Sequence, residues 1–178
     1  MRLGKIAKGA LCRLQNKSIY RSFGRWLSPK VTLREARDSD LMDVHQWLNF
    51  GKAFEPQHFS NLTEWVALYR DQIVGFVQLI RYPFDYELYK GFWLFNLNVK
   101  AIKRGMGIGT ALTRAVIDRA RAEGAPAIDL LVFEDNVPAI NLYRKMGFLP
   151  HIIPTLESSL ELELQRYGRR RLVMRRVL

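Results

Sequence analysis

The chain has 178 residues, of which 48% are apolar and 25% are charged, a size that suits one α/β core and is short for two. No apolar run approaches the roughly 20 residues needed to span a bilayer, and one cysteine with three scattered histidines excludes a disulfide framework and gives no metal-ligand spacing. The net charge of +11 lies at the two ends, because residues 1–34 and 166–178 hold 15 Lys or Arg and no acid, so it does not by itself indicate nucleic-acid binding by the core.

Residues 1–30 predict a basic amphipathic arm in front of a domain at 31–178. On a helix with about 100° per residue, the apolar side chains between residues 3 and 14 share one face, and the Lys and Arg side chains lie outside it. Such an arm can be an organellar transit peptide, can bind an anionic membrane or RNA, or can pack on its own domain. The expected location is the cytoplasm, or a mitochondrion or other organelle if the arm is a transit peptide.

Strands and helices are expected to alternate from residue 31 onward. Residues 31–37 predict a strand, and residues 38–48 predict a helix with an Asp-Ser cap at its start. A loop or broken helix is expected at 50–61, and a further helical stretch at 60–69.

A hairpin and a long strand are expected next. Residues 67–70 and 73–81 flank a turn at Asp71-Gln72, and a second turn region is expected at 83–91. Residues 92–99 then predict a strand whose side chains alternate between the two faces of the sheet. One face is expected to carry Phe95, Leu97 and Val99, and the other Asn96 and Asn98.

A glycine-rich segment follows that strand and leads directly into a helical pattern. It reads Arg104-Gly105-Met106-Gly107-Ile108-Gly109-Thr110. A helix that begins among glycines exposes unsatisfied N–H donors and the positive end of its dipole, and the absent side chains let a bulky diphosphate lie against the backbone. Because Arg104 adds a charged donor, the segment predicts a cradle for a pyrophosphate.

Two common nucleotide-binding patterns do not fit this cradle. A P-loop needs a Lys before its hydroxyl residue, and no Lys precedes Thr110. A dinucleotide-binding fold needs G-x-G-x-x-G in an N-terminal βαβ unit, whereas these glycines are spaced G-x-G-x-G and lie deep in the chain. A glycine-rich turn without a ligand is the other interpretation.

The chain after the cradle again predicts alternating helices and strands. Apolar residues repeat every four positions in the first helix, which Gly124 and Pro126 are expected to end. The following elements are expected at 127–133 (strand), from Asn136 (helix), at 148–153 (strand), at 155–167 (helix) and at 170–178 (strand).

The helix that starts at Asn136 carries a second motif, N-V-P-A-I-N-L-Y-R-K-M-G-F, which ends at Phe148. Asn136 is expected to cap this helix and Gly147 to terminate it, while the spacing places Ala139, Leu142 and Tyr143 on one face. Tyr143 as a packed core residue and Asn136 as a simple cap are the alternative interpretation.

Together the two motifs, about thirty residues apart, resemble those of the GNAT (Gcn5-related) N-acetyltransferases. Arg104, Gly107 and Gly109 match the family pattern [RQ]-x-x-G-x-[GA], and the second segment matches N-x-x-A-x-x-L-Y-x-K-x-G-F at every defined position. The resemblance covers residues 31–178 and implies the GNAT fold. This is an α/β fold with a mixed, twisted sheet of about six to seven strands flanked by helices and splayed between 92–99 and 127–133.

The resemblance also implies acetyl-CoA as cosubstrate and no metal. The pyrophosphate would lie on the loop formed by Arg104, Gly105, Met106, Gly107, Ile108, Gly109 and Thr110. The pantetheine arm would pair with the backbone of Leu97 and Val99 as an added strand, and Asn136 would hold it from the other side.

The activity implied by the resemblance is transfer of an acetyl group to a primary amine of a small molecule, peptide or protein. The amine attacks the thioester carbonyl directly, and Tyr143 is the candidate general acid that protonates the leaving thiolate. Many members carry a glutamate base on one of the two splayed strands, whereas this chain has asparagines on the first and leucines on the second. Glu134 and Asp135 lie just beyond the second of these strands, and Asp85 and Glu87 lie in the turn before the first.

The missing base bears on both acceptor and activity. An α-amine has a pKa near 8, compared with about 10.4 for lysine, so it reacts with less help from a base. The sequence therefore favours an α-amine or a similarly acidic amine as acceptor, or else indicates lost catalysis. The alternative function is a noncatalytic GNAT-fold protein that binds CoA, or that associates with RNA or the ribosome through its basic ends. The sequence leaves the acceptor and the oligomeric state open.

Overall fold

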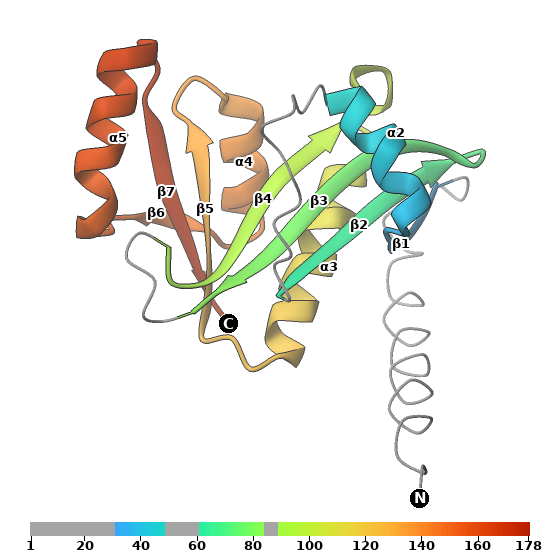
Figure 1. Ribbon diagram of the computed structural model, residues 1–178, viewed down its shortest axis with the longest axis horizontal. Coiled ribbons are helices and arrows are strands. Elements are labelled where there is room, and N and C mark those ends of the chain that lie inside the picture. Colours follow the sequence, from blue (N-terminus) through green and yellow to red (C-terminus); the bar gives the residue numbers. More distant parts are fainter. Residues whose placement is uncertain (1–30, 49–60, 84–88) are drawn as a thin grey trace, which may run out of the picture.

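The computed structural model describes residues 31–48, 61–83 and 89–178, which form one mixed sheet with helices on both faces (Figure 1). The arm predicted at 1–30, most of the loop predicted at 50–61, and Asp85 and Glu87 lie outside the described residues.

Seven strands form the sheet in the order β1-β2-β3-β4-β5-β7-β6. They are β1 (Val31–Glu35), β2 (Leu62–Tyr69), β3 (Gln72–Tyr82), β4 (Gly91–Val99), β5 (Ala127–Phe133), β6 (Leu149–His151) and β7 (Arg171–Val177). Neighbouring strands are antiparallel except β4 and β5, which run parallel. This arrangement confirms the predicted mixed sheet of six to seven strands.

Four α-helices and one 3₁₀ turn accompany the described part of the sheet. They are α2 (Asp38–Leu48), η2 (Ala101–Lys103), α3 (Ile108–Ala122), α4 (Val137–Lys145) and α5 (Pro154–Tyr167). The predictions for α2, α3, α4, α5, β5 and β7 are confirmed to within one or two residues at each end.

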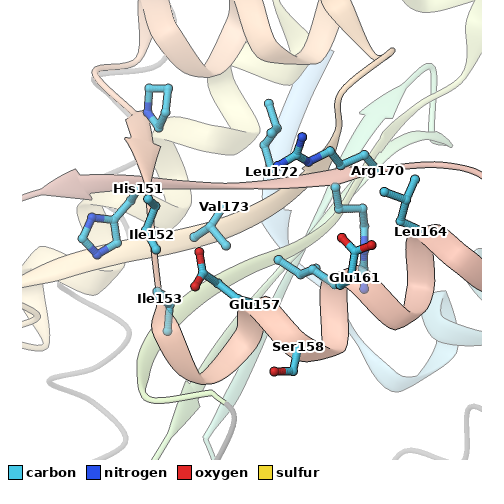
Figure 2. A pocket seen from close by; sticks show the side chains of 13 residues that line it. His151, Ile152, Ile153, Glu157, Ser158, Glu161, Leu164, Arg170, Leu172 and Val173 are labelled. Carbon is cyan, nitrogen blue, oxygen red and sulfur yellow. The ribbon is translucent and has the colours of Figure 1, made fainter.

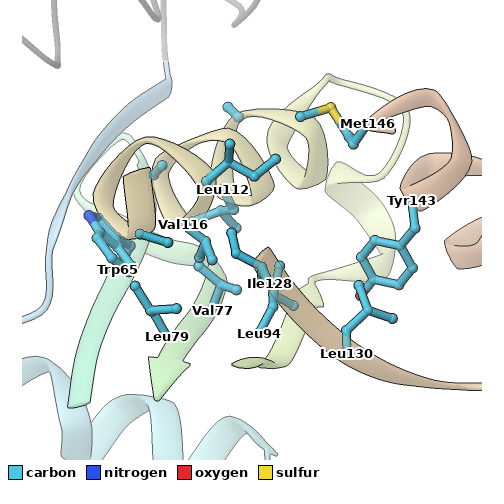
Figure 3. Packing of buried hydrophobic residues seen from close by; sticks show 14 of the residues in the cluster. Trp65, Val77, Leu79, Leu94, Leu112, Val116, Ile128, Leu130, Tyr143 and Met146 are labelled. Atoms are coloured by element: carbon cyan, nitrogen blue, oxygen red, sulfur yellow. The ribbon is translucent and has the colours of Figure 1, made fainter. Parts of the chain in front are cut away.

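The main core lies between the sheet and α3 (Figure 3). Apolar residues at every fourth position of α3 form its buried stripe, as predicted: Ile108, Leu112, Val116 and Ala120. The helix approaches β3 closely at Gly75, where an added Cβ would lie 2.9 Å from Ile108 Cγ2 and 2.9 Å from Leu112 Cδ1. The start of α3 is therefore seated on β3 at a place that only glycine fits.

The opposite face of the sheet carries two smaller apolar clusters. Val44 of α2 packs against Phe76 of β3, and Leu156 of α5 packs against Trp93 of β4. In Figure 1, α2 and α5 lie at opposite ends of the sheet. This face therefore carries one cluster under α2 and a second, aromatic-rich cluster under α5.

The helical stretch predicted at 60–69 is wrong, because residues 62–69 form strand β2. Trp65 and Ala67 are buried against α3, and Val66 is buried against α2, so both faces of the strand are covered. A strand buried on both faces reads as a continuous apolar run without period-2 alternation, which periodicity cannot distinguish from a helix. The β2–β3 turn lies at Arg70-Asp71, one residue earlier than predicted, with left-handed φ values of 50° and 61°.

The predicted facing of side chains on β4 is also partly wrong. Phe76 pairs with Asn98 and Gln78 pairs with Phe95, so two residues of β4 lie opposite one of β3 in a β-bulge. Asn96 occupies this bulge with a φ of 51°. The extra residue shifts the alternation, so Phe95 packs under α5, whereas Leu97 packs against the main core on the opposite face.

A buried ion pair ties β1 to the start of α2. Arg34 donates two hydrogen bonds to the Asp40 carboxylate, at 2.5 and 2.8 Å, and the Arg37 backbone N–H donates a third at 2.7 Å. Asp40 is only 8% exposed. The hydrogen bonds from Arg34 outweigh the burial and lower the pKa of the Asp40 carboxyl below its ordinary value.

Candidate active site

Strands β4 and β5 pair over three residues only and then diverge. The last parallel pair joins Leu94 to Leu130, although β4 continues to Val99 and β5 to Phe133. The predicted splay is therefore confirmed. Strand β4 remains paired with β3 and β5 with β7, so the diverging edges are inner edges whose backbone groups no longer pair with each other.

Val99 directs its backbone toward this splay. The next residue, Lys100, donates its N–H to the Val74 carbonyl at 2.9 Å and so faces β3. Because backbone groups alternate in direction along a strand, those of Val99 and Leu97 point toward β5. Their use by a pantetheine arm stays a prediction.

The predicted cradle sits at the end of β4 and forms the start of α3. Gly107 is the N-cap residue, with a φ of 78°, and Gly105 has a φ of 79°, so both adopt the left-handed conformation that glycine favours. No side chain caps this helix, and the first intrahelical bond runs from the Ala111 N–H to the Gly107 carbonyl at 3.0 Å. The preceding N–H groups, those of Ile108, Gly109 and Thr110, remain for an anion.

Other parts of the predicted loop also make contacts within the protein. Arg104 is exposed, and its Nε donates to the Val99 carbonyl at 3.2 Å, which holds the guanidinium beside the end of β4. Met106 packs against the main core. An added Cβ at Gly109 would lie 3.2 Å from Leu142 Cδ2, so this glycine also permits the close approach of α4 to α3.

Helix α4 places Asn136 and Tyr143 on the other side of the splay. Asn136 caps the helix by accepting a hydrogen bond from the Ala139 N–H at 3.3 Å, and Gly147 ends it with a φ of 84°, both as predicted. Asn136 is exposed at the tip that follows β5. Its cap role is confirmed, and its contact with a cofactor stays a prediction.

Tyr143 points from α4 into the sheet. In Figure 3 its ring extends toward Leu130, the last residue of β5 that pairs with β4. The side chain is 6% exposed, and its ring packs edge-on against Phe148 with centroids 5.8 Å apart. Burial raises the pKa of the Tyr143 phenol above its ordinary value. A phenol is protonated at neutral pH even without this shift, so its O–H is present as a donor.

Glu134 and Asp135, the two described acids near the splayed strands, both lie at the surface beyond β5. Asp135 pairs with Arg169 at the surface, with a shortest distance of 2.9 Å, and the hydrogen bonds from Arg169 lower the pKa of its carboxyl. Glu134 is exposed beyond the end of β5. Neither residue lies on a splayed strand, and the acid that does, Asp129 of β5, is buried and paired with Arg175 at 2.7 Å.

Sequence reasoning missed a polar chain on the face opposite α3. Gln78 of β3 donates from Nε2 to Glu64 Oε1 of β2 at 2.7 Å, and Asn96 of β4 donates from Nδ2 to Gln78 Oε1 at 2.5 Å. The available signal was the presence of two polar residues, Glu64 and Gln78, within the apolar runs of β2 and β3.

A hollow of about 860 Å³ lies apart from these residues, between α5 and the strands β6 and β7 (Figure 2). Its lining includes Glu157 and Glu161 of α5 and Arg170, which directly precedes β7. None of the predicted site residues lines it. Within residues 31–48, 61–83 and 89–178, no group of three metal-ligating side chains gathers, and no helix has the length and apolarity to cross a membrane.

Comparison with known sequences places these features in one family. The profile described as "Acetyltransferase (GNAT) family" matches residues 22–148. N-acetyltransferase family 8 member 2 of Rattus norvegicus is 32% identical over 124 residues, which cover 69% of this chain and 50% of the rat protein. L-methionine sulfoximine/L-methionine sulfone acetyltransferase of Pseudomonas aeruginosa is 33% identical over 35% of this chain and 37% of its own length. The chain thus spans at most half the length of these relatives.

Solved structures share the fold. Arabidopsis thaliana Naa50, in complex with the bisubstrate analogue CoA-Ac-MVNAL, has a TM-score of 0.64 at 22% identity over 84% of this chain and 99% of that one. A GNAT family acetyltransferase from Elizabethkingia anophelis with acetyl-CoA bound has a TM-score of 0.64 at 18% identity over 85% and 100% of the two chains. At these identities the similarity establishes the common architecture.

Proposed function

Because the chain belongs to the acetyltransferase (GNAT) family, we propose that it transfers the acetyl group of acetyl-CoA to a primary amine. The observation that carries this proposal is the junction of two features. The splay of β4 and β5 begins after Leu94, and the uncapped, glycine-flanked start of α3 lies at the end of β4. One ligand with an extended arm and a diphosphate fits both features.

In this proposal the described residues divide the binding of acetyl-CoA among them. The N–H groups of Ile108, Gly109 and Thr110 bind the pyrophosphate, and the exposed Arg104 adds a cationic donor. The backbone of Leu97 and Val99 binds the amide-rich arm, and Asn136 lies across from it at the start of α4. The cosubstrate supplies an activated acetyl thioester.

Tyr143 is proposed to act as the general acid. Its phenol lies on the α3 side of the sheet, beside the point where β4 and β5 separate, and is protonated at neutral pH, as phenols ordinarily are. As the amine nitrogen bonds to the acetyl carbon and the carbon–sulfur bond breaks, the phenol gives its proton to the departing thiolate. The amine loses its own proton to water.

An α-amine is the proposed acceptor class. Strand β4 carries no carboxylate, and the one on β5, Asp129, is buried and accepts two hydrogen bonds of 2.7 Å from Arg175. An amine that is substantially neutral near pH 8 therefore reacts with less help than a lysine side chain. Two of the similar proteins are named with a peptide or an amino-acid derivative: Naa50 with the bisubstrate analogue CoA-Ac-MVNAL, and the Pseudomonas aeruginosa enzyme with L-methionine sulfoximine.

Acetyl transfer to matched amines tests the proposal. The full chain is incubated with acetyl-CoA and either the peptide MVNAL, L-methionine sulfoximine, or an N-terminally blocked peptide whose sole amine is a lysine side chain. We expect product with at least one α-amine and a lower rate with the lysine peptide. Calorimetric binding of CoA without turnover of any amine would indicate the noncatalytic alternative, and no binding would refute the proposal.

A further inference from the structure

Three polar side chains form a chain across the middle of the sheet, on the face opposite α3. They come from adjacent strands, Glu64 from β2, Gln78 from β3 and Asn96 from β4, and two hydrogen bonds of 2.7 and 2.5 Å join them. On either side lie the apolar clusters under α2 and α5. The middle of this face is therefore polar where its flanks are apolar.

The carboxylate at one end determines which way both amides are turned. An ionised carboxylate only accepts hydrogen bonds, so Gln78 must direct its Nε2 toward Glu64 and its Oε1 toward Asn96. Asn96 must then direct its Nδ2 toward Gln78. Within the described residues, the carbonyl oxygen of Asn96, Oδ1, accepts no further hydrogen bond, and it is the acceptor at the open end of these hydrogen-bonded side chains.

The position of Asn96 links this chain to the splay. Asn96 occupies the β-bulge with a φ of 51° and lies two residues beyond Leu94, the last residue of β4 that pairs with β5. A left-handed backbone is uncommon outside glycine and is best tolerated by asparagine and aspartate. The bulge thus places an amide side chain beside the start of the proposed acetyl site, on the face opposite Tyr143.

Burying these hydrogen-bonded polar side chains costs free energy that packing alone would not require. Gln78 is 1% exposed, and an apolar side chain in its place would need no hydrogen-bond partners. Fully satisfied buried networks hold their members in one orientation, which is the property a binding group requires.

From this geometry, and resting on the function proposed above, we propose that Asn96 Oδ1 accepts a hydrogen bond from the acceptor amine. Gln78 and Glu64 are positioning residues that hold Asn96 in the accepting orientation. The amine is thereby held on one face of the splay while Tyr143 serves the leaving thiolate from the other.

Glu64→Gln is the decisive variant, because it preserves shape and hydrogen bonding but removes the charge that fixes the two amides. The side-chain amides of Gln78 and Asn96 can then flip, so that both hydrogen bonds reverse direction and Asn96 presents its NH₂ to the amine. Asn96→Gly removes the amide and keeps the left-handed backbone. The matched control is Glu123→Gln, whose carboxylate pairs with Arg119 at the end of α3 that is remote from the cradle.

The readouts are the KM of MVNAL or L-methionine sulfoximine, whichever the wild type acetylates, and its calorimetric Kd on enzyme saturated with CoA. Loss of one hydrogen bond predicts about a fivefold rise in both constants for Glu64→Gln and Asn96→Gly, with an unchanged KM for acetyl-CoA. Because Glu64 acts through Asn96, Glu64→Gln should add no further effect in the Asn96→Gly background. Glu123→Gln should match the wild type.

Unchanged amine constants in Glu64→Gln would overturn the proposal while leaving the acetyltransferase assignment intact. So would an effect of Glu64→Gln that persists in full after Asn96→Gly, because Glu64 would then act without Asn96. A wild-type protein that acetylates no amine would overturn both. Thermal unfolding of each variant separates a folding defect from these outcomes, and equal melting temperatures are expected for Glu64→Gln and the wild type.

Discussion

Replacing Gly107 with alanine should weaken acetyl-CoA binding much more than it weakens the fold. Gly107 has a φ of 78° at the N-cap of α3. An alanine in the left-handed conformation costs about 1–2 kcal/mol, so the loop of the variant favours other conformations. The conformation that binds then becomes about fivefold to thirtyfold less populated, and the affinity falls by the same factor. The lower entropy of the unfolded alanine chain offsets about 0.4–1 kcal/mol of the stability loss.

Gly124 supplies a matched control at the other end of the same helix. It has a φ of 75°, and an added Cβ would meet nothing within 4 Å, so Gly124→Ala carries the same backbone strain away from the cradle. Calorimetric titration with acetyl-CoA should show a Kd raised about fivefold to thirtyfold in Gly107→Ala and unchanged in Gly124→Ala. Both should lose similar stability in urea. Equal affinities in the two variants would refute the assignment of the cradle.

Three further changes test other parts of the account. Tyr143→Phe keeps the ring packing and removes the proton donor, so kcat should fall about a hundredfold with little change in the KM for acetyl-CoA. Gly75→Ala places a Cβ 2.9 Å from Ile108 Cγ2, and this overpacking should lower the free energy of unfolding in urea by about 1–3 kcal/mol. Asp40→Asn removes the ion pair with Arg34 and should cost about 1–3 kcal/mol at pH 7. Since Arg34 lowers the folded pKa of Asp40, this difference is complete above the unfolded pKa near 3.9 and should disappear as the pH falls through the folded pKa.

Each of these expectations has an opposing result. Equal kcat values in Tyr143→Phe and the wild type would mean that water protonates the thiolate. A fully stable Gly75→Ala would mean that α3 shifts on the sheet at no cost. A stability difference between Asp40→Asn and the wild type that persists undiminished at pH 2 would show that the charge of Asp40 is not its source.

Local signals predicted the second half of the fold well. The start of α3 and both ends of α4 depend on glycines and on the Asn136 cap, all of which act within a few residues. The β2 strand was mistaken for a helix because its burial on both faces depends on α2 and α3, which a window of sequence does not contain.

The acceptor side of the site could not be predicted for a related reason. The bulge at Asn96 is a property of the pairing between β3 and β4, and it moves Phe95 to the face opposite Leu97. The chain from Glu64 to Asn96 likewise joins residues that are 32 positions apart in the sequence. Only the register of three strands brings them together.

Backbone hydrogen exchange with and without acetyl-CoA tests whether the cosubstrate binds at the start of α3 and along β4, because this placement assigns individual N–H groups to it. We expect new protection of the N–H groups of Ile108, Gly109 and Thr110, and of Leu97 or Val99 on the splayed edge of β4. Protection confined to another surface, such as the hollow between α5 and β7, or no change at the start of α3, would contradict it.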